Sequence, residues 1–379
     1  MWWRVVGCLL FVGSVVDAAQ RDASVLATEM TTRYAPYADW AKVMDVDVLA
    51  RQLPSRYWRT PEEIASVRAE GALPLTGLHL ALDPGHIGGR WADAERRHFR
   101  IAADDFYVRE GELVLLVAQR AREQLIELGA TVSLLREANL PVNPRAPFDY
   151  LELAAAQVPK PTECTLEALW AYGCALRSRA ERLSIVTGDL LERVRLVNQE
   201  VQPDALISLH INAAVWPASG SDGDEKMLRL VDSNHLHALI FGCMSAGELQ
   251  SGGQQAELAV KLVNGSGAVE QLLGDTLMTA LAEATALPAA RYEGQNAILL
   301  DIEQPYLFAR NLLMLRMAEC PTVLLEPYVA NSVTAYARIQ AALADRAAGR
   351  ALAEDDILVE YADAVVAGVL DCYASALVD

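Results

Sequence analysis

Short apolar runs recur along the chain and predict buried strands. These runs are Leu78–Asp83, Thr131–Leu135, Asp204–Ile211 and Thr322–Glu326. Apolar residues at three- and four-residue spacing predict helices over Glu112–Leu128, Ser178–Gln199, Ala268–Thr285 and Ile357–Asp371. Because strands and helices alternate, the pattern predicts an α/β fold: a three-layer sandwich whose mostly parallel, mixed and twisted sheet has helices on both faces.

The segments around this core predict the domain organisation. Residues 1–18 combine Arg4, a short apolar stretch and the small-residue end Val16-Asp17-Ala18, which is typical of a secretory signal peptide and predicts an exported, periplasmic or extracellular protein. No later stretch is long and apolar enough for a membrane span, so we expect none in the mature chain. Residues 19–76 predict a helical, aromatic lead-in packed on a main domain over 77–379, with insertions at about 138–177 and 214–265.

Composition and cysteine content narrow the class of protein. The net charge is −18, so no basic surface is available for nucleic acid or an anionic membrane, and we expect neither as a partner. Cysteines in an exported chain can form disulfides. Cys164 and Cys174 are the best-placed pair, and buried free thiols are the alternative.

The ends of the apolar runs carry metal-ligand residue types. His86 closes the first run after Pro84-Gly85, and His210 closes the run Ala205–Leu209. Either Glu110 or Glu112, at the entrance of a predicted helix, supplies a carboxylate. Two histidines and a carboxylate, with one open position, are the composition of a catalytic zinc site. The alternatives are a turn histidine, a core histidine and ordinary first-turn acids.

Two further observations bear on this site. Glu326 ends a strongly apolar run, where a carboxylate needs a partner to stay ionised, and a metal-bound water would be a suitable one. Glu326 could then act as a general base. His235 and His237 form another candidate ligand pair, but the sequence offers no carboxylate close to them.

Taken together, these motifs resemble the zinc-dependent N-acetylmuramoyl-L-alanine amidases of bacterial cell-wall turnover. The matching pieces are Leu-Asp-Pro-Gly-His86, Glu110 before Leu113-Val114-Leu115, Ser-Leu-His210-Ile-Asn212-Ala and Leu-Leu-Glu326, together with Arg193, Asn198 and Arg316. The resemblance covers roughly residues 78–370. It implies zinc held by His86, Glu110 and His210, a catalytic Glu326, and substrate-binding roles for Asn212 and Arg316.

The implied activity is hydrolysis of the amide bond between N-acetylmuramic acid and L-alanine in peptidoglycan or a muropeptide, with room for an activator protein. The sequence departs from the family at the long loop 87–109, at Gly111, where lysine is usual, and at Pro327-Tyr328, where Gly-Phe is frequent. Residues 214–265 are a candidate cover for the site. Another exported zinc peptidase or amidohydrolase, or a non-catalytic wall-binding protein of the same fold, are the alternatives.

Overall fold

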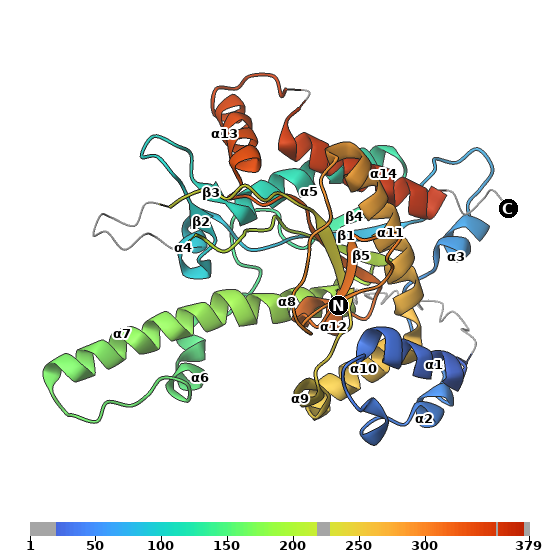
Figure 1. The fold of residues 1–379 in the computed structure, drawn as a ribbon, viewed down its shortest axis with the longest axis horizontal. Coiled ribbons are helices and arrows are strands. Elements are labelled where there is room, and N and C mark those ends of the chain that lie inside the picture. Colours follow the sequence, from blue (N-terminus) through green and yellow to red (C-terminus); the bar gives the residue numbers. More distant parts are fainter. Residues whose placement is uncertain (1–19, 218–227, 354, 375–379) are drawn as a thin grey trace, which may run out of the picture.

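The computed structural model describes residues 20–217, 228–353 and 355–374, and the signal peptide expected over 1–18 lies outside these ranges. A mixed seven-stranded sheet forms its centre, in the order β4-β1-β5-β9-β6-β8-β7 (Figure 1). The strands are β1 His79–Pro84, β4 Thr131–Leu134, β5 Ala205–Leu209, β6 His237–Phe241, β7 Ile298–Leu299, β8 Leu307–Arg310 and β9 Thr322–Glu326. A separate ribbon pairs β2 His98–Phe99 with β3 Val108–Arg109.

The strands change direction between β9 and β6. Strands β4, β1, β5 and β9 are parallel, so their carboxyl ends share one edge of the sheet. Strand β6 runs antiparallel to β9, and this pairing places His237 directly opposite Glu326. Strand β8 is parallel to β6, and β7 is antiparallel to β8. The sheet is therefore mixed, as the sequence predicted.

Alternation along the strands builds two hydrophobic layers. In β1, Leu80 and Leu82 belong to the core beneath one face, whereas Ala81 belongs to the core beneath the other. The first face is covered by α5 Glu110–Glu127, α11 Ser266–Thr285 and α14 Ile357–Ala374, and the second by α8 Asp189–Arg195, α10 Gly252–Asn264 and α12 Leu313–Met317. This arrangement confirms the predicted three-layer α/β sandwich.

One helical prediction needs correction in its extent. The helix expected to begin at Ser178 begins at Leu166, because Thr165 caps it by accepting a hydrogen bond from the Ala168 amide. This helix, α7 Leu166–Arg182, lies with α6 Leu151–Ala155 in the expected insertion and projects from the body of the protein (Figure 1). Beyond Arg182 the chain continues through a wider helical turn into α8.

From His237 onward, the second expected insertion is part of the layered core. Its apolar run forms β6 of the central sheet, and its later residues form α9 Ala246–Leu249 and α10. A run buried on both faces does not alternate, so periodicity alone could not place it in the sheet. Cys164, Cys174, Cys243, Cys320 and Cys372 are all free thiols.

The lead-in contains α1 Ala23–Glu29, α2 Val46–Ala50 and α3 Pro61–Ser66, with shorter helical turns between them. Arg33 ties it to the main domain: its guanidinium is buried, donates to the carbonyls of Phe241 and Gly267, and pairs with Glu270. Glu270 also accepts from Lys261 at 2.7 Å. None of the helices in the described ranges is long and apolar enough to cross a membrane.

Candidate metal centre

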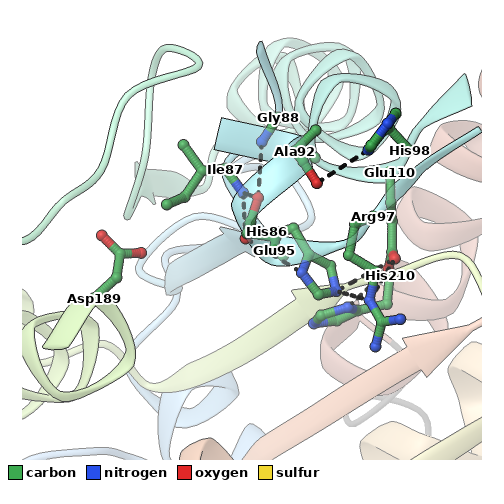
Figure 2. A network of polar contacts seen from close by, with 12 residues as sticks. His86, Ile87, Gly88, Ala92, Glu95, Arg97, His98, Glu110, Asp189 and His210 are labelled. Atoms are coloured by element: carbon green, nitrogen blue, oxygen red, sulfur yellow. Dashed lines mark hydrogen bonds and ion pairs between the residues drawn. The ribbon is translucent and has the colours of Figure 1, made fainter. Parts of the chain in front are cut away.

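The edge where the parallel strands end brings three of the predicted residues together. His86 follows β1, His210 follows β5, and Glu110 opens α5. Glu110 Oε1 lies 3.0 Å from His210 Nδ1, and Glu110 Oε2 lies 3.2 Å from His86 Nε2 (Figure 2). One ligand atom from each residue falls within 4.8 Å of the other two.

Arg193 of α8 fixes the turn that carries His86 through hydrogen bonds to its backbone. This guanidinium is 1% exposed; it donates to Asp83 Oδ1 at 2.6 Å, to the Pro84 carbonyl at 2.7 Å and to the His86 carbonyl at 2.9 Å. Asp189 pairs with its Nε at 2.8 Å. Arg193 therefore connects the helix layer to the backbone of the histidine turn. His86 itself adopts a left-handed conformation with φ of 54°.

Gly85 is required by the close approach of two strand ends. A Cβ at this position would lie 2.3 Å from Cε1 and 2.4 Å from Nε2 of the His210 imidazole. Any other residue would therefore displace one of the two histidines. Gly111, where the resembling family has lysine, is similarly enclosed, since its Cβ would lie 2.5 Å from the Gly88 amide nitrogen.

His86 has a second carboxylate partner that orients its ring. Glu95 Oε1 lies 3.3 Å from His86 Nδ1, and the Glu95 carboxylate also accepts from the Ile87 amide. Arg97 Nε donates to His86 Nε2 at 3.3 Å. A nitrogen that accepts from arginine carries no proton, so the other nitrogen, Nδ1, is the one protonated towards Glu95. The Nε2 lone pair, which accepts from Arg97 here, is the one that a cation would take in place of this hydrogen bond, the usual arrangement around metal-binding histidines.

The electrostatic environment distinguishes the two key carboxylates. Burial by itself would raise the pKa of Glu110, but the facing His86 and His210 outweigh it and lower this pKa to about 2. Burial opposes the charged form of His210 too, yet its hydrogen bond to Glu110 raises the pKa of His210 overall. For Glu326, burial dominates and raises the pKa to about 7. Glu110 is thus ionised and can offer its carboxylate oxygens to a metal ion, whereas Glu326 can exchange a proton near neutral pH.

Glu326 and the two histidines line one cavity of about 470 Å³. The cavity lies on the sheet face that packs against α8 and α12, and its floor includes Ser208 and Leu324. Arginines also contribute to its wall, among them Arg97 and Arg310. The arrangement offers a cluster of metal donors, a carboxylate able to take up a proton, and room for a polar substrate.

The donor set suits zinc. Two imidazole nitrogens and one carboxylate are ligands that zinc prefers, whereas magnesium and calcium favour oxygen donors alone. The absence of room for a Cβ at Gly85 shows that the His210 ring is packed closely against the turn that carries His86. The residues present therefore fit a three-ligand zinc site with an open position.

Other residues singled out in the sequence lie outside this cluster. Glu112 accepts from the Gly89 amide and from Arg109, so it faces away from the histidines. Asn212 contacts His235 at 3.1 Å, and neither side chain lines the cavity that holds Glu326. Arg316 pairs with Glu257 and likewise does not line that cavity.

Three residues of the site carried no sequence signal. Glu95 and Arg97 belong to the long polar loop after His86, whose path depends on tertiary contacts. Arg310 ends the four-residue strand β8, which is too short for a periodic pattern. Their proximity to the strand ends emerges only in three dimensions.

Comparison with known proteins adds the following observations. No family model matches the chain. Among curated proteins, it is 31% identical over 190 residues to the tRNA modification GTPase MnmE of Janthinobacterium sp. (strain Marseille). The match covers 46% of this chain and only 37% of that protein. No glycine in the chain is followed by lysine, so the Gly-Lys pair of a phosphate-binding P-loop is absent from the sequence.

Solved structures similar to this chain include several cell-wall amidases. The CwlD amidase from Clostridioides difficile, in complex with the GerS lipoprotein, is 13% identical with a TM-score of 0.40, covering 79% of this chain and 98% of that one. Ami1 from Mycobacterium smegmatis is 17% identical with a TM-score of 0.40, covering 79% and 99%. The amidase AmiC2 of Nostoc punctiforme is 14% identical with a TM-score of 0.37, covering 79% and 98%.

Proposed function

We propose that this chain is a zinc-dependent N-acetylmuramoyl-L-alanine amidase that hydrolyses the amide bond between N-acetylmuramic acid and L-alanine in peptidoglycan. The observation that carries the proposal is the convergence of His86, Glu110 and His210 at the edge of the sheet, with Glu326 lining the cavity that the two histidines also line. The motifs that lead into these four residues also resemble that family in sequence order.

In the proposed site, His86, Glu110 and His210 hold the metal. Zinc bound there supplies a Lewis acid for the scissile carbonyl and lowers the pKa of a water molecule. Glu95 keeps the proton of His86 on Nδ1, and Arg193 holds the backbone of the histidine turn. These two residues position a metal ligand.

Glu326 performs the proton transfers. Because burial raises its pKa to about 7, the carboxylate is partly ionised at neutral pH and can take a proton from the attacking water. The protonated acid then donates to the nitrogen of L-alanine as the carbon–nitrogen bond breaks. The same group thus serves as base and then as acid, and the alanine amine leaves neutral.

The proposal also includes where the enzyme acts. The signal peptide expected over 1–18 supports export to the periplasm or outside the cell, where peptidoglycan is found. The substrate class is peptidoglycan or a soluble muropeptide, and an activator protein is compatible with this assignment. The net charge of −18 supports neither nucleic acid nor an anionic membrane surface as a partner.

The decisive experiment compares Glu326→Gln with the wild-type mature chain. Zinc content is measured by atomic spectroscopy, and muropeptide products are identified by mass spectrometry. We expect the variant to retain zinc but to lose about 100-fold or more in turnover, because the proton acceptor is gone. Glu137→Gln is the matched control, since Glu137 is an exposed side chain paired only with Arg122.

The alternatives give different results in this experiment. Near-normal turnover by Glu326→Gln would contradict the catalytic assignment. Cleavage of ordinary peptides in preference to muropeptides would point to an exported zinc peptidase. A wild-type chain that binds no zinc and cleaves neither substrate would favour a non-catalytic wall-binding protein.

A further inference from the structure

Arg310 presents a cationic group to the cavity without a carboxylate of its own. Among the described residues, no Asp or Glu forms an ion pair with this guanidinium; Glu326, which lines the same cavity, interacts with it only through the longer-range field of the two charges. Arg193, in contrast, is paired with both Asp83 and Asp189. A partly buried guanidinium that forms no ion pair within the described residues is available to an anionic group of a ligand.

The position of Arg310 is supported by neighbouring rings. Its guanidinium carbon lies 5.7 Å from the centroid of the Tyr292 ring. The Tyr292 hydroxyl in turn forms a 2.8 Å hydrogen bond with Nε2 of His237, which is 3% exposed. His237 lies on β6 directly opposite Glu326. Tyr292 is therefore a fixed surface beside the arginine, and its hydrogen bond to His237 attaches it to the strand pair that carries the proposed catalytic glutamate.

Arg310 also lines a second cavity of about 470 Å³. The other lining residues are Cys243, Ser245, Glu248, Gln295, Asn296 and Asn311. Hydroxyl and amide groups predominate in this set, and such groups hydrogen-bond to peptide N–H and C=O groups. Arg310 is thus the residue shared by the cavity that holds Glu326 and a polar cavity beyond it.

The chemistry of the proposed substrate indicates which part fits here. The lactyl carboxyl of N-acetylmuramic acid is consumed in the scissile amide, so the sugar side of that bond offers no carboxylate. The stem peptide, on the other side of the bond, carries free carboxylates on its acidic residue and at its end. An arginine without an internal partner therefore distinguishes the peptide side from the sugar side.

We propose that Arg310 binds a carboxylate of the stem peptide and that the polar cavity beyond it receives part of that peptide. This inference rests on the proposed amidase function and goes beyond it, because it assigns a binding residue and a direction to the substrate. In this orientation the scissile bond lies at Glu326, the stem peptide extends from there past Arg310, and the sugar lies on the opposite side of the scissile bond.

The test measures binding rather than turnover. Zinc-loaded mature chain carrying Glu326→Gln, which prevents hydrolysis, is titrated calorimetrically with an N-acetylmuramoyl tripeptide. The ligand is used both as the free acid and with its carboxylates amidated. Arg310→Gln and Arg310→Lys are added to this parent. Arg350→Gln is the matched control, because Arg350 is an exposed arginine paired with Asp345 and lies far along the chain after β9.

We expect Arg310→Gln to weaken binding of the free acid by about 10- to 100-fold, the range of a hydrogen bond to a charged group. Binding of the amidated ligand should be unchanged, and Arg310→Lys should restore part of the loss. Equal free-acid binding by parent and Arg310→Gln would overturn this inference while leaving the amidase proposal intact. Equal weakening for both ligands would also overturn it, because the arginine would then be acting on the structure. A parent that binds neither ligand would contradict the amidase function itself, and this inference with it.

Discussion

Replacing Gly85 by alanine tests the geometry of the proposed metal centre with the smallest available perturbation. Gly85 has no unusual positive φ, so alanine can adopt its backbone conformation, and the effect is purely one of space. The added Cβ would lie 2.3 Å from Cε1 of the His210 ring, where ordinary contacts begin at 3.4 Å. The imidazole or the histidine turn must therefore move by about 1 Å.

A shift of that size is enough to prevent metal binding, but it is small enough for the protein to stay folded. Metal–ligand distances are held to within about 0.2 Å, so a displacement of about 1 Å removes His210 from coordination. We expect zinc affinity to fall by at least about 100-fold, the upper range found even for losses of supporting residues. The overpacking should cost about 1–3 kcal/mol of folding stability, which leaves the protein folded if it is of ordinary stability.

Zinc affinity is measured by competition with a chelator of known affinity, and the fold is followed by circular dichroism and thermal unfolding of the metal-free chain. Gly173→Ala is the matched control. It lies in the interior of α7 with nothing within 4 Å of the added Cβ, so alanine should leave zinc binding unchanged and stabilise the helix by about 1 kcal/mol at most. If folded Gly85→Ala bound zinc as tightly as the wild type, His210 would not be a ligand in the arrangement described here.

Three further predictions concern the residues that support the site. Glu95→Gln should weaken zinc binding by about 10- to 100-fold with little change in melting temperature, because the amide no longer fixes the His86 proton as strongly; chelator competition measures this, and unchanged affinity would exclude a supporting role. Arg193→Met should reduce the free energy of unfolding by about 3–5 kcal/mol in denaturant titrations, since it leaves the carboxylates of Asp83 and Asp189 buried without their partner; a loss below about 1 kcal/mol would contradict this. Burial opposes ionisation of Asp83, but Arg193 outweighs it and lowers the pKa of Asp83 below that of the unfolded chain, so its stabilisation is present above about pH 3.9 and disappears as the pH falls through the lower folded pKa. Acid titration should therefore show a steeper loss of stability below pH 4 in the wild type than in Asp83→Asn, and identical slopes would refute this account.

The fold class and the convergence of the principal side chains follow from the order of apolar runs. Parallel strands joined by helices place their carboxyl ends at one edge, so residues that end such runs meet there. This reasoning brings His86, His210 and Glu326 to a common region, and Glu110 joins them because α5 begins beside the same edge. The local sequence pattern is sufficient to predict this meeting, because the end of an apolar run marks the end of the strand and so the residue that lies at the edge of the sheet.

Other features depended on contacts between segments far apart in the chain. The preference for Glu110 over Glu112 came from a family resemblance in the sequence, and the structure gives its physical basis in the opposite directions of the two side chains. The apolar run of strand β6 is buried throughout, between β9 and β8, and its lack of alternation gave no sign of a strand in the sequence. Asn212 and Arg316 contact His235 and Glu257, and the substrate-binding roles expected for them stay predictions.

The amino-acid sequence by itself determined the alternation of strands and helices and the residue types at the strand ends, because both depend on local periodicity and on the burial of apolar side chains. Only the tertiary structure decided that Glu95 supports His86 and that Arg310 stands between two cavities. Polar residues in loops and short strands have no periodic signal, and their positions are set by the hydrogen bonds and ion pairs that form once the layers have packed.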